Sequence, residues 1–356
     1  IEDNIYSEYF KLTDEYQKKY GKYTVILMQV GSFLEVYGVK DSTGEIHYSQ
    51  IQHFSETCQL NIAEKKSMYN IKNKTSGQIV MAGFMVYLLE KYLPRIIDGG
   101  YTAVVYLQEK EPLKGGKSYN RVLYKIFSPG TFVPCDTDSS PQITNNIMCV
   151  WIQRVKPIGN NCESKIKDVM ICGISVVNIF TGKSYLFEYQ TPFLLNNTAF
   201  DELERAVSVF QPSELLLLSP FDSNENKKVI QYSGISSPSI HYYNTENNAD
   251  TRISNCENQQ YIKQILSVFY DESVYDVCSE FHNNITATQS FCFLLNFIQE
   301  HNSDLIRKIS LPVFNNTSDR LILANHTLMQ LNIIDDGSKN CNGQFSSVLS
   351  FLNKCC

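Results

Sequence analysis

One unbroken apolar run, Leu-Leu-Leu-Leu within residues 214–219, most constrains how this chain can fold. A strand that is apolar on both faces must be covered on both sides, as is typical of a parallel strand in an α/β sheet. The elements around it follow the order strand, strand, strand, helix, strand, which predicts an α/β unit. The first four of these elements are residues 148–153, 169–177, 183–189 and 200–210.

A separate mixed unit is predicted before it. Aromatic residues recur at roughly helical spacing over residues 6–20, and Gly21 follows as a helix stop signal. Residues 24–29 predict a buried strand, and Gly31 allows a tight turn into a partner strand at residues 33–37. Further along come a predicted helix and two strands, so helices and a small sheet are expected together. These elements are residues 86–97, 101–107 and 121–128.

Polar stretches separate these parts. Residues 135–146 are polar, contain a proline and predict a linker, and residues 222–258 are again rich in Asn and Ser. Beyond them the periodicity is helical, with four predicted helices at residues 261–270, 274–281, 286–300 and 321–331. The sequence thus predicts an α/β multi-domain protein with a helical C-terminal part. It starts without Met and stops inside a helical pattern, so we expect a longer protein.

Charge and cysteine content narrow the classes of function. The formal net charge is −6, but residues 1–130 carry 16 basic and 14 acidic side chains (+2), and residues 131–356 carry 15 and 23 (−8). A polyanion should therefore prefer the N-terminal third. The eleven cysteines include no C-x-x-C pair and no zinc spacing, which favours a reduced, intracellular compartment and no metal. No apolar run approaches the ~20 residues of a membrane span, and no signal peptide opens the chain, so we expect neither a membrane protein nor a secreted one.

Two stretches imitate a phosphate-binding loop, residues 115–118 and residues 181–184. A Walker loop also needs a glycine five residues before its second one, where this chain has Glu111 and Val177. A carboxylate at Glu111 would repel the phosphate, and Thr181-Gly182 is better explained as a hairpin turn. The six histidines are isolated from one another, and no nucleophile–base pair is evident, so no catalytic residue is predicted.

The densest basic patch consists of Lys65, Lys66, Lys72 and Lys74, with only Glu64 opposing them. A patch of this kind is most simply a solvated loop. The functional alternative is a loop that contacts DNA phosphates, which supplies affinity without reading sequence.

The segment Phe33-Leu34-Glu35-Val36 raises a sharper question. Residues two apart in a strand share a face, so Phe33 and Glu35 lie on one face and Leu34 and Val36 on the other. If Leu34 and Val36 face the core, Phe33 and Glu35 are exposed together. Such a pair suits a device that wedges between bases and tests the disturbed base with a hydrogen bond. The alternative is a buried Phe33 and an edge charge at Glu35.

The motifs of the first 134 residues, taken in order, resemble the N-terminal domain of the MutS family of DNA mismatch-repair proteins. "GSFLEVYG" resembles the family's Gly-Asp-Phe-Tyr-Glu-Leu-Phe, with Ser32 in place of Asp and Leu34 in place of Tyr. Residues 6–20 and 60–66 are similar to the family's first helix and to a strand that ends in a basic pair. "MAGF", "VVYLQE" and "SPGT" are similar to further family motifs in the right order, at residues 81–84, 104–109 and 128–131.

The resemblance continues beyond this domain. Residues 147–255, with "GISVVNIFTGK" and "QPSELLL", are similar to the family's connector domain, whose fold resembles ribonuclease H without its catalysis. Residues 256–356 look like the beginning of the helical core and lever domain, with Asn332 where the family has Glu. The Asn/Ile/Lys/Tyr-rich composition looks like that of an AT-rich genome, and the overall look of the chain is similar to the MutS branch found in giant viruses and soft-coral mitochondria.

The resemblance implies specific roles. Phe33 would stack on a mispaired base, Glu35 would hydrogen-bond that base, and Lys65, Lys66, Lys72, Lys74 and Met81 would hold the DNA backbone. The expected partner is double-stranded DNA with mismatches or small loops, and the full-length protein would form a homodimer or pair with a paralogue. ATP and Mg would bind an ATPase domain beyond this chain, which itself would bind no cofactor and catalyse nothing. Cytoplasm, nucleus, mitochondrion and virus factory are all compatible compartments.

Two rival functions stay open at this point. One is an α/β interaction module without mismatch specificity. The other is a metal-dependent nuclease built on the ribonuclease-H-like unit, which needs several carboxylates at neighbouring strand ends. The strands at residues 169–177 and 183–189 offer only Glu188, with Asp168 just before the first of them.

Overall fold

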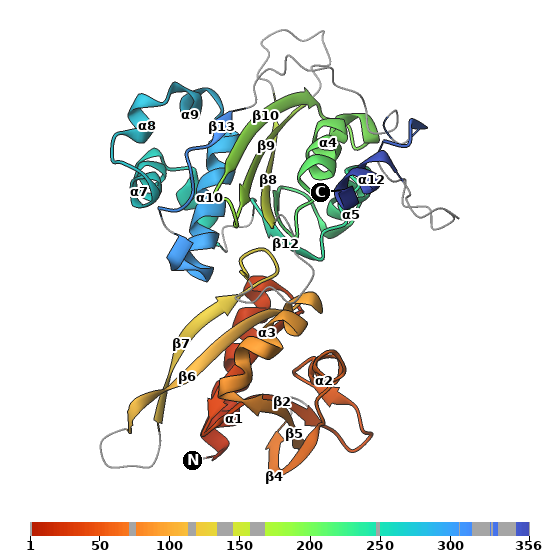
Figure 1. Ribbon diagram of the computed structural model, residues 1–356, viewed down its shortest axis with the longest axis vertical. Helices are drawn as coiled ribbons and strands as arrows, with labels where there is room; N and C mark the ends of the chain where they lie inside the picture. Colours follow the sequence, from red (N-terminus) through yellow and green to blue (C-terminus); the bar gives the residue numbers. More distant parts are fainter. Residues whose placement is uncertain are drawn as a thin grey trace. The chain divides into compact units, whose positions relative to one another are not determined.

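The structure is a computed structural model that describes residues 2–70, 76–112, 119–133, 145–156, 168–246, 250–305, 307–314, 328, 330–333 and 347–355. The chain forms two compact units, shown in Figure 1. Unit 1 comprises Ile1–Asn145 with Pro238–His241 and Asn296–Ile306, and unit 2 comprises Asn146–Ser237, Tyr242–Leu295 and Arg307–Cys356. The α/β class is confirmed, and the division into three domains stays a prediction.

Unit 1 is built on a seven-stranded sheet with the order β4-β5-β2-β1-β6-β7, in which β3 also pairs with β2. The strands are β1 (Thr24–Val30), β2 (Phe33–Lys40), β3 (Ile46–His47), β4 (Ala63–Asn70), β5 (Ser76–Met85), β6 (Thr102–Pro112) and β7 (Tyr119–Phe127). The central strand β1 is antiparallel to β2 and parallel to β6. The predicted strand-turn-strand over residues 24–37 is therefore confirmed.

Helices pack on both faces of this sheet. They are α1 (Glu2–Tyr20), α2 (Ile51–Cys58), the short η1 (Val86–Leu88) and α3 (Leu89–Asp98). The ring of Tyr37 meets the rings of Tyr6 and Tyr9 on α1 edge-on, with centroids 5.1 and 5.0 Å away. On the opposite face, Gly38 faces Ile51 of α2. The predicted first helix ends as expected, because Gly21 follows it with φ +94°.

Unit 2 is built on a six-stranded sheet with the order β12-β11-β8-β9-β10-β13. Its strands are β8 (Asn146–Val155), β9 (Val169–Asn178), β10 (Ser184–Pro192), β11 (Glu214–Ser219), β12 (Ser239–Asn244) and β13 (Val313–Phe314). Every residue of β11 is buried and the strand is parallel to β8, as its apolar run predicted. The turn at Thr181-Gly182 is also confirmed, since it joins the antiparallel pair β9–β10 and Gly182 has φ +69°. The other phosphate-loop mimic, residues 115–118, lies outside the described residues.

The remaining helices lie between residues 197 and 355, and those after residue 258 partly match the predicted helical C-terminal part. They are η2 (Asn197–Phe200), α4 (Asp201–Phe210), α5 (Ser223–Tyr232), α6 (Thr251–Cys256), α7 (Gln259–Phe269), α8 (Val274–Val277), α9 (Ser279–Asn283), α10 (Ile285–His301), η3 (Ser303–Leu305) and α12 (Val348–Cys355). The polar stretch 222–258 holds α5, β12 and α6, which its composition concealed. A sequence signal was present for α5, because Asp222 and Glu225 form a capping box at its start. The predicted linker core and most of the helix at 321–331 lie outside the described residues.

Candidate nucleic-acid interface

The hairpin between β1 and β2 has a rigid tip. Val30 and Phe33 are cross-strand partners, so the loop contains only Gly31 and Ser32. Gly31 has φ +61°, the left-handed backbone that a type II′ hairpin turn needs at its first position. Gln29 supports the tip, because its Nε2 donates to the Gly31 carbonyl (2.9 Å) and its Oε1 accepts from the Gln108 amide (2.9 Å). The first residue after the turn, Phe33, is thereby fixed in position.

Phe33 lies at the surface, with 37% of the residue exposed. Leu34 and Val36 are buried, at 0% and 1%, so the predicted assignment of strand faces is confirmed. The alternative in which Phe33 belongs to the core is wrong. The sheet holds a large aromatic ring out toward solvent.

Glu35, in contrast, is buried, so the expectation that it is exposed together with Phe33 was wrong. Only 4% of the residue is accessible, because α1 covers the face that Glu35 shares with Tyr37. The Tyr37 hydroxyl donates a hydrogen bond to Glu35 Oε2 at 2.5 Å, and Lys65 Nζ lies 3.3 Å from the same oxygen. Strand alternation therefore placed Glu35 on the correct face but could not show that a helix covers that face.

This arrangement fixes the Glu35 carboxylate. Burial raises the pKa of the Tyr37 hydroxyl far above its ordinary value, and its hydrogen bond to Glu35 raises that pKa further. The phenol therefore keeps its proton and acts as a donor at neutral pH. Both contacts involve Oε2, and Oε1 takes part in neither. Sequence analysis missed Tyr37, although its spacing of two residues from Glu35 in a strand was a usable signal.

Removing the Tyr37 hydroxyl is expected to destabilise unit 1. In Tyr37→Phe the buried carboxylate loses its short hydrogen bond while the ring packing is kept, so the free energy of unfolding should fall by about 1–3 kcal/mol. Urea denaturation of the variant and the wild type measures this loss. Tyr124→Phe is the control, because Tyr124 is 57% exposed. Equal stability of all three proteins would mean that the Tyr37–Glu35 contact contributes nothing.

A close approach of strands accompanies Glu35. Its partner on β5 is Gly83, the glycine of "MAGF". A Cβ at Gly83 would lie 2.5 Å from the Leu34 carbonyl oxygen, closer than side chains tolerate. Only glycine fits there without moving the backbone that carries Phe33 and Glu35.

The predicted basic patch is only partly described. Lys65 and Lys66 lie in β4 at the edge of the sheet, where the pairing with β5 shifts register between Glu64 and Met68. Lys65 pairs with Glu35, and Lys66 is exposed. Lysines on an irregular edge strand also discourage unwanted strand pairing, which is their simplest structural role. Lys72 and Lys74 lie outside the described residues.

The remaining predicted residue, Met81, lies within β5. It is half-buried and in register with Tyr37 on one side and Ala63 on the other. Its role in DNA contact stays a prediction.

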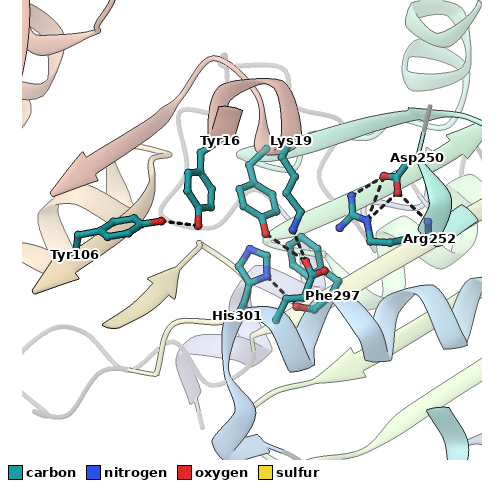
Figure 2. A network of polar contacts seen from close by, with 9 residues as sticks. Tyr16, Lys19, Tyr106, Asp250, Arg252, Phe297 and His301 are labelled. Carbon is teal, nitrogen blue, oxygen red and sulfur yellow. Dashed lines mark hydrogen bonds and ion pairs between the residues drawn. The ribbon is translucent and has the colours of Figure 1, made fainter. Parts of the chain in front are cut away.

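A second set of polar contacts in unit 1 surrounds the C-terminal end of α1, as Figure 2 shows. The hydroxyls of Tyr16 and Tyr106 share a hydrogen bond of 3.0 Å, and Lys19 Nζ pairs with a Glu300 carboxylate oxygen at 2.9 Å. His301 stacks on the Phe297 ring with centroids 3.9 Å apart. The Lys19–Glu300 pair ties residues 296–301 to α1, and the stack on Phe297 gives His301 a packing role.

Among the residues that the structure describes, one group of three could reach a metal ion, namely Asp41, Glu45 and His47. Its atoms already have partners. Asp41 Oδ1 accepts from the backbone amides of Thr43 and Glu45, and Asp41 Oδ2 lies 2.8 Å from His47 Nε2. Hydrogen bonds from Thr43 and His47 hold the pKa of the Asp41 carboxyl well below its usual range. The group is explained as a hydrogen-bonded turn between β2 and β3.

The carboxylates of the nuclease hypothesis have structural partners of their own. Glu188 accepts hydrogen bonds from the Thr286 and Ala287 amides at 2.8 and 3.2 Å and so stabilises the first turn of α10. Asp168 pairs with Arg154 at 2.6 Å. Asp168 precedes Val169, whose partner Pro192 is four residues beyond Glu188, or roughly 13 Å along the strand. These two carboxylates are too far apart to share a metal ion.

No helix in the described ranges is both long and apolar enough to span a lipid bilayer.

Comparison with known proteins gives a consistent set of relatives. Residues 5–136 match the family model described as MutS domain I. The chain is 26% identical to a putative DNA mismatch repair protein mutS homolog of Acanthamoeba polyphaga mimivirus, over 99% of this chain and 32% of that protein. It is 22% identical to the mitochondrial DNA mismatch repair protein mutS homolog of Sarcophyton glaucum, over 99% of this chain and 37% of that protein. It is 24% identical to the DNA mismatch repair protein MutS of Methanosarcina barkeri, over 56% of this chain and 20% of that protein. The chain spans about a third of the length of the first two.

Proposed function

The chain belongs to the MutS family, and we propose on this basis that its unit 1 binds double-stranded DNA at mispaired bases or small loops in DNA mismatch repair. The observation that carries the proposal is the exposed ring of Phe33 on the rigid hairpin tip. A partly exposed aromatic ring that is held at the end of a strand is available to stack on a base.

The selectivity follows from the energy of opening DNA. An apolar side chain that enters the minor groove must unstack a base step, which costs a few kcal/mol. A mispaired base is already poorly stacked, so opening its step costs less, and kinking the duplex there costs less too. Phe33 would therefore read no base sequence, because it detects how easily a base step is unstacked and kinked.

Glu35 supplies the second part of the proposed contact. Tyr37 and Lys65 hold Oε2, so Oε1 is the oxygen that would accept a hydrogen bond from the displaced base. Lys65, Lys66, Lys72, Lys74 and Met81 are proposed to contact the DNA backbone, which sets affinity without selecting a sequence.

We expect ATP and Mg²⁺ to bind in a C-terminal ATPase domain outside this chain, and the full-length protein to pair with itself or with a paralogue in an intracellular compartment. This chain is proposed to act by binding, with no cofactor or catalytic step of its own. Unit 2 would then serve as the connector, with a ribonuclease-H-like fold, and its helices as the start of the core and lever.

A salt series with two duplexes tests the proposal. The duplexes are identical except for one G·T mispair or one unpaired T. We expect the affinity for both to fall with salt at the same slope, because the same phosphates are contacted. The mispaired duplex should nevertheless bind at least about fivefold more tightly at every salt concentration, from the stacking of one base on an aromatic ring. An interaction module without mismatch specificity would show no such offset.

A further inference from the structure

The side chain next to Phe33 on the neighbouring strand is Met85. Phe33 and Met85 form the last registered pair between β2 and β5, and the Val86 amide donates to the Ser32 carbonyl just beyond them at 2.9 Å. Paired side chains of adjacent strands point to the same face, with Cβ atoms about 4.5–5.5 Å apart. Phe33 and Met85 therefore stand side by side at the tip.

The pair is unusual for its exposure. Met85 is 39% exposed and Phe33 is 37% exposed, whereas the next residue on this face of β2, Glu35, is 4% exposed and faces a glycine. One exposed apolar residue needs no explanation, whereas two that are paired across adjacent strands form a contiguous apolar surface beside the hairpin tip. Phe33 and Met85, the last registered pair of β2 and β5, thus form one exposed apolar surface.

We propose that Met85 is a specificity-determining residue that enters the DNA together with Phe33. This inference rests on the proposed function and extends it. Methionine is among the side chains that can wedge between base steps from the minor groove. Its thioether is flexible and makes favourable contacts with the edge of an aromatic ring. Phe33 stacks on the mispaired base while Met85 fills the rest of the opened step, so a step must open widely to bind well.

The test compares three variants at Met85 with one control, using the G·T and matched duplexes and the protein otherwise intact. Met85→Ala is expected to reduce the preference for the mispaired duplex about five- to tenfold, with matched-duplex affinity within about twofold of wild type. Met85→Gln, which keeps the length of the side chain but not its apolar character, should lose the preference to the same extent. Met85→Leu should keep most of it. Met68→Ala is the control, because Met68 is 55% exposed on β4 and has Gln78 as its partner.

DNA bending gives a second readout. Energy transfer between dyes at the two ends of the mispaired duplex should show a smaller bend with Met85→Ala than with wild type. A Met85→Ala protein with wild-type preference and wild-type bend would overturn the inference. If Phe33→Ala abolishes the preference while Met85→Ala keeps it, only the role of Met85 is overturned and the proposed function survives. If neither substitution changes the preference, the proposed function of Phe33 is overturned as well.

Discussion

Phe33→Ala is expected to abolish the preference of the protein for mispaired DNA. The ring is the part of the tip that can stack on a base, and stacking one base on an aromatic side chain contributes about 1–3 kcal/mol. Its loss should therefore weaken binding to a G·T or unpaired-T duplex by roughly 5- to 150-fold. Competition between labelled mispaired and unlabelled matched duplexes measures the change.

The matched duplex provides the internal comparison. Because Phe33 is partly exposed and its strand is held by Gln29 and Ser32, the variant should unfold at nearly the same urea concentration as wild type. Lys66→Ala serves as the contrasting variant: Lys66 is exposed and is proposed to contact phosphate, so its loss should weaken binding of both duplexes equally and leave the preference intact. A folded Phe33→Ala protein that still prefers the mispair would show that another residue makes the discrimination.

Gly83→Ala is expected to give the largest loss of stability in unit 1. The new Cβ would lie 2.5 Å from the Leu34 carbonyl oxygen and 3.2 Å from Glu35 Cα, and both are backbone atoms that can yield only by separating β2 from β5. Overpacking of this kind costs typically about 1–3 kcal/mol and sometimes more, and we expect the upper end here. Urea denaturation measures the loss, and DNA competition should show a reduced preference because Phe33 moves with its strand.

A matched control exists in the same pair of strands. Gly38 also faces close neighbours, but its Cβ would meet the Ile46 and Ile51 methyl carbons at 2.8 and 3.0 Å, which are side-chain atoms and not backbone atoms. Gly38→Ala should thus cost less stability than Gly83→Ala, because side chains can adjust without separating the strands. If Gly83→Ala were as stable as Gly38→Ala, the close approach at Gly83 would not be what requires glycine there.

Sequence reasoning predicted those features that depend on neighbouring residues in the chain. Strand alternation placed Leu34 and Val36 inside and Phe33 outside, and the apolar run at residues 215–218 predicted a parallel strand. Both follow from side-chain direction and from the need to cover apolar surface. The turn at Gly182 was predictable for the same local reason.

Features that depend on distant parts of the chain were not predictable in this way. The burial of Glu35 depends on α1, which lies 15 to 33 residues before it, and on Lys65, which lies 30 residues after it. The partnership of Phe33 with Met85 depends on the register of β5, and nothing in either segment alone specifies it. The capping role of Glu188 likewise depends on α10, about a hundred residues later, which is why a carboxylate in a strand could suggest a metal site.

The exposed ring of Phe33 on the rigid hairpin tip is proposed to select DNA where stacking is weak. Competition binding by the wild-type protein tests it most directly, with two duplexes that differ only in one G·T pair, at one salt concentration and in several flanking sequences. We expect the mispaired duplex to bind at least about fivefold more tightly in every flanking sequence. Equal affinity for the two duplexes would contradict it.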